Sequence, residues 1–171
     1  MFYGKRALIL TCLLAMLAGT GLHFLYEWLP NPVTALLSPI NESLWEHIKL
    51  IYWPYLAAAL WLNRGRPGGI RPWLLALPIM SGLMLLLGYL YHIVLGGEAM
   101  AVDIAIFVAV MVFGFWFSPR FSGPFHGAKW MGPILLVVGM GILIALFTLW
   151  PPDHILFIDL SKTGAWYQIP C

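Results

Sequence analysis

The densest group of chemically active side chains in this sequence lies in residues 38–50. Two acids, Glu42 and Glu46, are followed there by His47 and Lys49. A helix that needs only an N-terminal cap does not require so many ionisable groups in its first turns. Imidazoles and carboxylates are ligands for zinc and iron, and a His–carboxylate pair can also perform general acid–base chemistry. The segment therefore predicts a functional site of one of these types.

A second group consists of His23 and Glu27, whose spacing of four residues puts both on one face of a helix. Glu27 falls near the C-terminal end of an apolar stretch, where the helix dipole disfavours a carboxylate. His23 lies about one turn deeper, at a depth that is still within hydrocarbon if the stretch spans a membrane. Ionisable groups at such depths usually face a bundle interior or a water-filled cavity, and they are candidates for function.

We expect these side chains to meet around one cavity that opens outward. The predicted catalytic residues are His23, Glu27, Glu46 and Lys49. The predicted ligands of a divalent metal such as zinc or iron are Glu42, His47 and His92. The predicted substrate-binding residues are Asn41, Trp45, Tyr89 and Asp103.

A structural alternative explains part of this polarity. Acids in the first turn of a helix are favoured by the dipole, which covers Glu42, Glu46 and Asp103. Ser43 and Glu46 also fit a capping box, in which the Glu side chain reaches back to the cap amide. A His23–Glu27 hydrogen bond that merely holds helices together is the corresponding alternative for the first group.

The elements that must position these residues are membrane helices. Of 171 residues, 61% are apolar and 9% are charged, far below the quarter that soluble domains carry. An aromatic content of 15% excludes a disordered chain, and a net charge of +2 without a basic run argues against nucleic acid as a partner. We predict one membrane domain over residues 1–171 that is an all-α integral membrane protein. Its five transmembrane helices are expected at about 6–28, 44–62, 73–95, 99–117 and 130–150.

The charges predict the orientation. Seven of the nine bases fall at the N-terminus and in the second and fourth connections, which share one side in a five-helix serpentine. The positive-inside rule makes that side the cytoplasm, with the N-terminus inside and the C-terminus outside. All seven acids and four of the five histidines fall at the opposite, outer end, and only His126 is expected inside.

The link Gly96-Gly97 is so short that the helices on either side should be antiparallel neighbours. The outer tail, residues 151–171, reads as a short β-hairpin, with a strand from Ile155 to Leu160 and a return from Ala165 to Ile169. It either packs on the lipid headgroups as a short tail or forms a lid that carries Asp153 and His154 to the rim of the outer cavity.

Several functions fit this pattern. The first is an enzyme at the outer leaflet that acts on a lipid or lipid-linked substrate, through metal or acid–base chemistry. A non-enzymatic accessory or assembly protein is the main alternative, and haem binding by His23 with His92 is another. A transporter is disfavoured, because the inner half of each span is nearly free of ionisable residues and no repeat is visible. The oligomeric state stays open.

The sequence resembles a bacterial membrane-protein family known as a domain of unknown function. The resemblance rests on the string His23-Phe24-Leu25-Tyr26-Glu27-Trp28, on the string from Ser38 to Leu50, and on Pro151-Pro152 with Thr163-Gly164 in the tail. It implies a five-helix fold in a bacterial plasma membrane and supplies no activity. The chain also has a weak similarity to sterol-isomerase-like membrane proteins, which use a His and acids near a lipid pocket, through the His-x-x-x-Glu pair alone.

Overall fold

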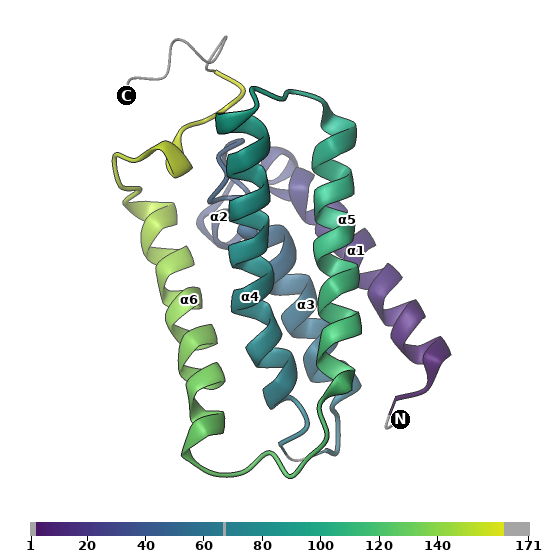
Figure 1. Ribbon diagram of the computed structural model, residues 1–171. Helices are drawn as coiled ribbons and strands as arrows, with labels where there is room; N and C mark the ends of the chain where they lie inside the picture. Colours follow the sequence, from purple (N-terminus) through teal and green to yellow (C-terminus); the bar gives the residue numbers. More distant parts are fainter. Residues whose placement is uncertain (1–2, 67, 163–171) are drawn as a thin grey trace.

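The computed structural model describes residues 3–66 and 68–162, and all regular structure in this part of the chain is helical (Figure 1). The elements in chain order are α1 (Lys5–Trp28), α2 (Pro32–Leu37), α3 (Ile48–Leu62), α4 (Arg71–Gly88), the π-helical segment η1 (Tyr89–Val94), α5 (Met100–Phe117), the 3-10 turns η2 (Ser118–Arg120) and η3 (Ala128–Trp130), α6 (Met131–Leu149) and the 3-10 turn η4 (Ile155–Phe157). The all-α prediction is confirmed for these residues.

Four helical stretches are long and apolar enough to cross a membrane. They are Lys5–Trp28, Arg71–Val94, Met100–Arg120 and Ala128–Leu149. These stretches match four of the five predicted spans to within a few residues, so the protein has the helices of a membrane protein.

The predicted span 44–62 differs from the observed helix. Only Ile48–Leu62, 15 residues, forms a continuous helix, and it is shorter than the other four. The preceding residues form tight turns, in which the amides of Ile48 and Lys49 donate to the carbonyls of Trp45 and Glu46 at 3.1 Å. Glu42, Glu46 and His47 therefore lie just before the helix, and only Lys49 lies in its first turn.

Helix α3 forms the centre of the bundle and packs against α1, α2, α4 and α5 (Figure 1). Nine of its residues are buried, whereas only Cys12, Ala15 and Gly19 are buried in α1. The outer face of α1 exposes a run of leucines, as expected for a helix that faces lipid rather than water.

Tyrosine hydroxyls cross-link α3 to the outer helices. Tyr52 donates to the carbonyl of Val137 in α6 at 3.0 Å. Tyr55 lies 3.2 Å from the carbonyl of Gly114 and 2.6 Å from the Ser118 hydroxyl. Buried phenols need such partners, and here they set the distance of α5 and α6 from α3.

Helix α2 is an element that sequence analysis missed. Asn31 accepts hydrogen bonds from the amides of Val33 and Thr34, Thr34 caps the Asn31 amide in return, and Pro32 occupies the first helical position. Asn followed by Pro is a start signal for a helix, so the sequence contained the information. Because α2 folds back after α1, residues 38–47 lie at the end of the bundle where α1 ends and α3 begins (Figure 1).

The link Gly96-Gly97 forms the tight turn expected of it, with Gly96 at a φ of 66° and the Gly97 amide bonded to the Tyr91 carbonyl at 2.9 Å. Helices α4 and α5 on its two sides pack together. The expectation that they are neighbours is confirmed.

The predicted strand from Ile155 to Leu160 is wrong. Residues Ile155–Phe157 form a 3-10 turn whose first amide bonds go to His154, and the carbonyl of Leu156 accepts from the Trp45 amide at 3.0 Å. The backbone thus bonds to the loop before α3 rather than to a partner strand. The predicted return strand, Ala165 to Ile169, lies outside the described residues.

Gly19 allows α1 to approach α3, and its replacement should separate the two helices. A Cβ at Gly19 would lie 2.7 Å from the Leu50 carbonyl oxygen, which is backbone and cannot rotate away. We expect Gly19→Ala to lower the thermal unfolding temperature in detergent and to displace His23, one turn along α1. Gly21→Ala is the matched control, since a Cβ there meets no atom within 4 Å. The unfolding temperature of Gly21→Ala should be unchanged or higher, because Ala is favoured over Gly in a helix by about 0.5–1 kcal/mol. Equal behaviour of the two variants would contradict the close approach.

Candidate metal centre

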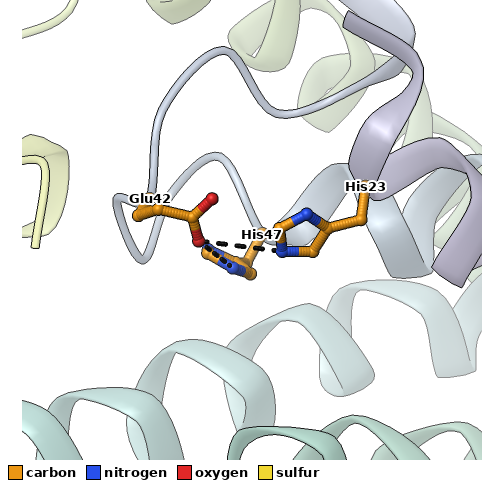
Figure 2. A group of neighbouring side chains, drawn as sticks. All are labelled: His23, Glu42 and His47. Carbon is orange, nitrogen blue, oxygen red and sulfur yellow. Dashed lines mark ion pairs between the residues drawn. The ribbon is translucent and has the colours of Figure 1, made fainter. Parts of the chain in front are cut away.

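Three ionisable side chains from separate parts of the chain meet at one end of the bundle (Figure 2). His23 lies in the last turns of α1, Glu42 in the loop after α2, and His47 immediately before α3. The Glu42 carboxylate oxygen Oε2 lies 3.7 Å from Nε2 of His23 and 3.3 Å from Nε2 of His47. We call these three residues the His–Glu triad.

The ring of His47 is oriented by the backbone. Its Nδ1 lies 2.8 Å from the carbonyl oxygen of Ser43. A carbonyl only accepts hydrogen bonds, so Nδ1 carries a proton and Nε2 faces Glu42. Metal-binding histidines are commonly held in this way, with the second ring nitrogen donating to a carbonyl.

Ser38 fixes the loop of Glu42 against the turn of α1 that carries His23. Its hydroxyl donates to the Leu22 carbonyl and accepts from the Tyr26 amide at 3.1 Å. Ser38 is fully buried. The position of Glu42 relative to His23 thus depends on a hydrogen-bonded junction inside the protein.

The triad has the composition and spacing of a divalent metal site. One ligand atom from each residue lies within 4.8 Å of the other two. Ligands about 2.1 Å from a tetrahedral zinc ion lie roughly 3.4 Å apart, so the observed separations need little adjustment. The side chains of His23, Glu42 and His47 are 31%, 45% and 20% exposed, which leaves solvent access on one side. Two imidazoles and one carboxylate with an open position form the ligand set of hydrolytic zinc sites and of non-haem iron(II) sites.

The charges within the triad reinforce one another. The hydrogen bond from His47, aided by the positive charges of both histidines, holds the pKa of the Glu42 carboxyl below its ordinary value despite partial burial. Burial of the His47 ring acts to lower its pKa, but the hydrogen bonds to Glu42 and Ser43 outweigh burial and raise it. The triad therefore holds a carboxylate that is hydrogen-bonded to the His47 imidazole, with the His23 imidazole 3.7 Å away.

His92 and Asp103 form a second pair at this end of the bundle. Nε2 of His92 lies 2.7 Å from Oδ1 of Asp103, and its Nδ1 lies 2.8 Å from the carbonyl oxygen of Gly97. Both ring nitrogens thus face oxygen atoms, so the His92 ring is held in place from two sides. The charge of Asp103 also contributes to the raised pKa of His47, so the pair acts on the triad electrostatically. His92, predicted as a metal ligand, lies outside the triad.

Glu46 and Lys49, two of the predicted catalytic residues, form a buried ion pair separate from the triad. The Lys49 ammonium lies 2.5 Å from Glu46 and also donates to the carbonyls of Ala35 and Ser38, at 2.8 and 3.3 Å. The Glu46 carboxylate accepts a further bond from the Ile40 amide at 2.8 Å. All three ammonium protons are used, and the Lys49 side chain is 0% exposed. The pair joins α2 and the loop of Glu42 to the start of α3.

The expected capping box is wrong in its second half. The Ser43 hydroxyl does accept from the Glu46 amide at 3.3 Å. The Glu46 side chain, however, reaches Ile40 and Lys49, and the Ser43 amide donates to the Asn41 side chain at 3.0 Å. The buried ammonium attracts the carboxylate more strongly than a single amide would.

The remaining predicted site residues lie around the triad without joining it. Glu27 is exposed near the end of α1, and Tyr89 is half-buried at the start of η1. Asn41 caps the Ser43 amide. The Trp45 ring packs between Phe147 of α6 and Phe157 of the tail, and its Nε1 is buried without a hydrogen-bond partner.

Asp159 helps to hold the loop of Glu42, although its place in the sequence predicted only that it lies at the outer end. Its Oδ1 accepts from the Glu42 amide at 3.4 Å and from Ser161, and its Oδ2 pairs with Lys162 at 2.8 Å. The tail is thereby attached to the loop that holds a triad residue. Asp153 and His154, which the lid hypothesis placed at the cavity rim, are exposed. The pattern Asp-x-Ser-Lys, typical of a turn, was the available signal.

The Glu46–Lys49 pair should be a major source of stability. We expect Lys49→Met to destabilise the protein by about 3–5 kcal/mol, since it leaves a buried carboxylate without its cation. Lys162→Met is the matched control, because its ion pair is 81% exposed on the lysine side and should contribute only ~0–1 kcal/mol. Unfolding in mixed micelles with rising denaturing detergent measures both. A Lys49→Met protein as stable as Lys162→Met would show that Lys49 is free for another role.

Comparison with known proteins yields a family without an assigned activity. A search of curated proteins and a search of solved structures each found no significant match. The family model of DUF6512, described as a family of unknown function, matches residues 3–168. The expected resemblance to an uncharacterised domain family is confirmed. The chain belongs to this family of unknown function.

Proposed function

We propose that this protein is a metal-dependent membrane enzyme that acts on a lipid or lipid-linked substrate at the outer face of a bacterial plasma membrane. The observation that carries the proposal is the His–Glu triad, in which one ligand atom from each of two imidazoles and one carboxylate lies within 4.8 Å of the other two. Zinc or iron(II) suits this ligand set. The position of the triad at the end of a lipid-facing bundle supports an amphiphilic substrate.

A bound zinc ion would supply Lewis acidity and activate water for attack on an ester or phosphoester. The protein residues have defined tasks around it. His23 and His47 supply nitrogen ligands, Glu42 supplies an oxygen ligand, and Ser43 holds the His47 ring in the required tautomer. The hydrogen-bonded His92–Asp103 pair, in which the charge of Asp103 acts on His47, is the candidate for a group that would protonate a leaving group.

The membrane arrangement that accompanies this proposal has five spans, with α3 as the shortest. At 1.5 Å per residue its 15 residues cover about 22 Å, less than the hydrocarbon thickness of ~30 Å. The turns before α3 extend this length, and the buried first half of α3 packs against the longer helices α1 and α4, so much of this short span meets protein rather than lipid. Helix α1 starts at one end of the bundle and α6 ends at the other, as an odd number of crossings requires (Figure 1). The basic end of the bundle would face the cytoplasm.

Metal binding by the triad is the direct test. Purified, chelator-treated protein should bind about one equivalent of zinc or iron(II), measured by competition with a chromogenic chelator and by elemental analysis. We expect His23→Ala and Glu42→Gln to weaken binding by at least the 10–100-fold typical of outer-shell changes, since both remove ligands. Binding should also weaken as the pH falls through the raised pKa of His47, because protons then compete for the ligand nitrogen.

Glu27→Gln is the matched control for Glu42→Gln, because it removes an exposed carboxylate of the same bundle end outside the triad. Its metal affinity should equal that of the unchanged protein. Equal loss in both variants, or an unchanged protein that binds neither zinc nor iron(II), would refute the metal site. Hydrolysis of lipid esters and phosphodiesters by metal-loaded protein, absent from the Glu42→Gln variant, then tests the enzyme proposal itself.

Cysteine accessibility in intact cells tests the five-span arrangement. In a background without Cys12 and Cys171, single cysteines are introduced as Gly4→Cys, Arg64→Cys and Ser161→Cys. A membrane-impermeant maleimide should label only Ser161→Cys in intact cells, and all three after lysis. Labelling of Gly4→Cys and Arg64→Cys from opposite sides would show that α3 does not cross.

A further inference from the structure

A second cavity lies at the opposite end of the bundle from the His–Glu triad. It has a volume of about 290 Å³ and is formed by the N-terminal residues, the connection before α4 and the connection between α5 and α6. Its lining includes Tyr3, Arg66, Pro72, Phe121, Phe125 and His126. The lining therefore combines aromatic surface with one permanent cation.

The walls of this cavity are held by hydrogen bonds. The Tyr3 hydroxyl donates to the Asn63 side chain at 2.6 Å and accepts from Nε1 of Trp73 at 3.0 Å. The guanidinium of Arg71 donates to the Phe125 carbonyl at 2.5 Å. Three connecting segments are thus joined around one space, which distinguishes the cavity from a gap between loose loops.

Within residues 3–66 and 68–162, no ion pair involves the charge of Arg66. Its guanidinium carbon lies 4.7 Å from the centre of the Tyr3 ring, a cation–π contact that leaves the N–H groups available. All seven acids of the sequence lie outside the segments that form this end of the bundle. The ion pairs among the described residues all involve side chains of the triad end. An anion from outside the chain is therefore the natural partner of Arg66.

The neighbouring side chains indicate which kind of anion fits. Arg64 and Arg120 stack on Trp61 and Trp116, at 4.9 and 3.7 Å from the ring centres. Exposed tryptophans mark the membrane interface, where the phosphates of lipid headgroups lie. Guanidinium binds phosphate oxygens in a bidentate manner, and the apolar walls suit the glycerol and upper acyl segments.

We propose that this cavity binds the phosphate headgroup of an anionic phospholipid, with Arg66 as its principal ligand. The site is separate from the His–Glu triad, so it stands or falls independently of the proposed metal chemistry. The lipid would join the connections before α4 and before α6, and would thereby stabilise this end of the bundle.

The test uses full-length protein, stripped of lipid in a neutral detergent and titrated with phosphatidylglycerol. Thermal unfolding and native mass spectrometry measure binding. We expect Arg66→Gln to bind phosphatidylglycerol at least ten-fold more weakly, since it removes the charge and the bidentate hydrogen bonds to phosphate. Arg64→Gln is the matched control, since Arg64 is nearby and exposed but lies outside the cavity lining. Its affinity should be unchanged, and phosphatidylcholine should bind weakly to all three proteins.

Three results would overturn the proposal. Equal weakening in Arg64→Gln and Arg66→Gln would show a diffuse attraction of the basic surface. Equal stabilisation by inorganic phosphate would show a site for a soluble anion rather than for a lipid. Failure of phosphatidylglycerol to bind the unchanged protein would remove the site altogether. Arg66→Lys should recover part of the affinity, because it restores the charge without the bidentate geometry.

Discussion

The structure depends on one constraint, which is that the buried Lys49 ammonium must have a full set of acceptors. An ammonium ion removed from water is tolerated only when its charge and its protons are all satisfied. Glu46 supplies the charge, and the carbonyls of Ala35 and Ser38 supply the remaining acceptors. These carbonyls belong to α2 and to the following turn, so the chain after α1 has to fold back over the start of α3. The same fold brings Glu42 and His47 next to His23.

Polar residues that are neighbours in the sequence have two different tasks in the structure. Glu46 and Lys49 point into the protein and form the support, whereas Glu42 and His47 point toward the solvent-accessible end and form the triad. A spacing of four residues puts Glu42 and Glu46 on one face only if the segment is helical. Here the segment consists of turns, and the two carboxylates diverge. Two of the three triad residues and the ion pair that supports them therefore come from a single stretch of thirteen residues, 38–50, while α1 supplies His23.

The sequence was sufficient for the four long apolar helices, and its eleven candidate site residues include the three triad residues, but it grouped Glu42 and His47 with His92 rather than with His23. Long apolar runs and their Gly- and Pro-containing breaks predict α1, α4, α5 and α6, because length and hydropathy are local properties. Hydropathy reveals neither the start of α3, which depends on turns bonded to a buried ammonium, nor the short helix α2, for which the signal was the pair Asn31-Pro32. The depth of His23 singled it out, whereas its nearest carboxylate proved to be Glu42 in the loop rather than Glu27 on the same helix. The strand predicted in the tail failed because the amide of Trp45 offers that segment a bond that no local pattern reveals.

The attachment of the tail to the loop has a consequence for how the protein is made. The Glu42 amide bonds to Asp159, a residue 117 positions further along the chain, and the Trp45 amide bonds to Leu156. While only α1, α2 and α3 have been synthesised, these two amides have no tail to bind, and the loop that carries Glu42 is held from the side of α1 and α3 alone. The amides acquire their acceptors only after α6 and residues 155–159 have been synthesised. This loop therefore completes its backbone hydrogen bonds late in synthesis, although His23 and His47 belong to parts of the chain that are made early.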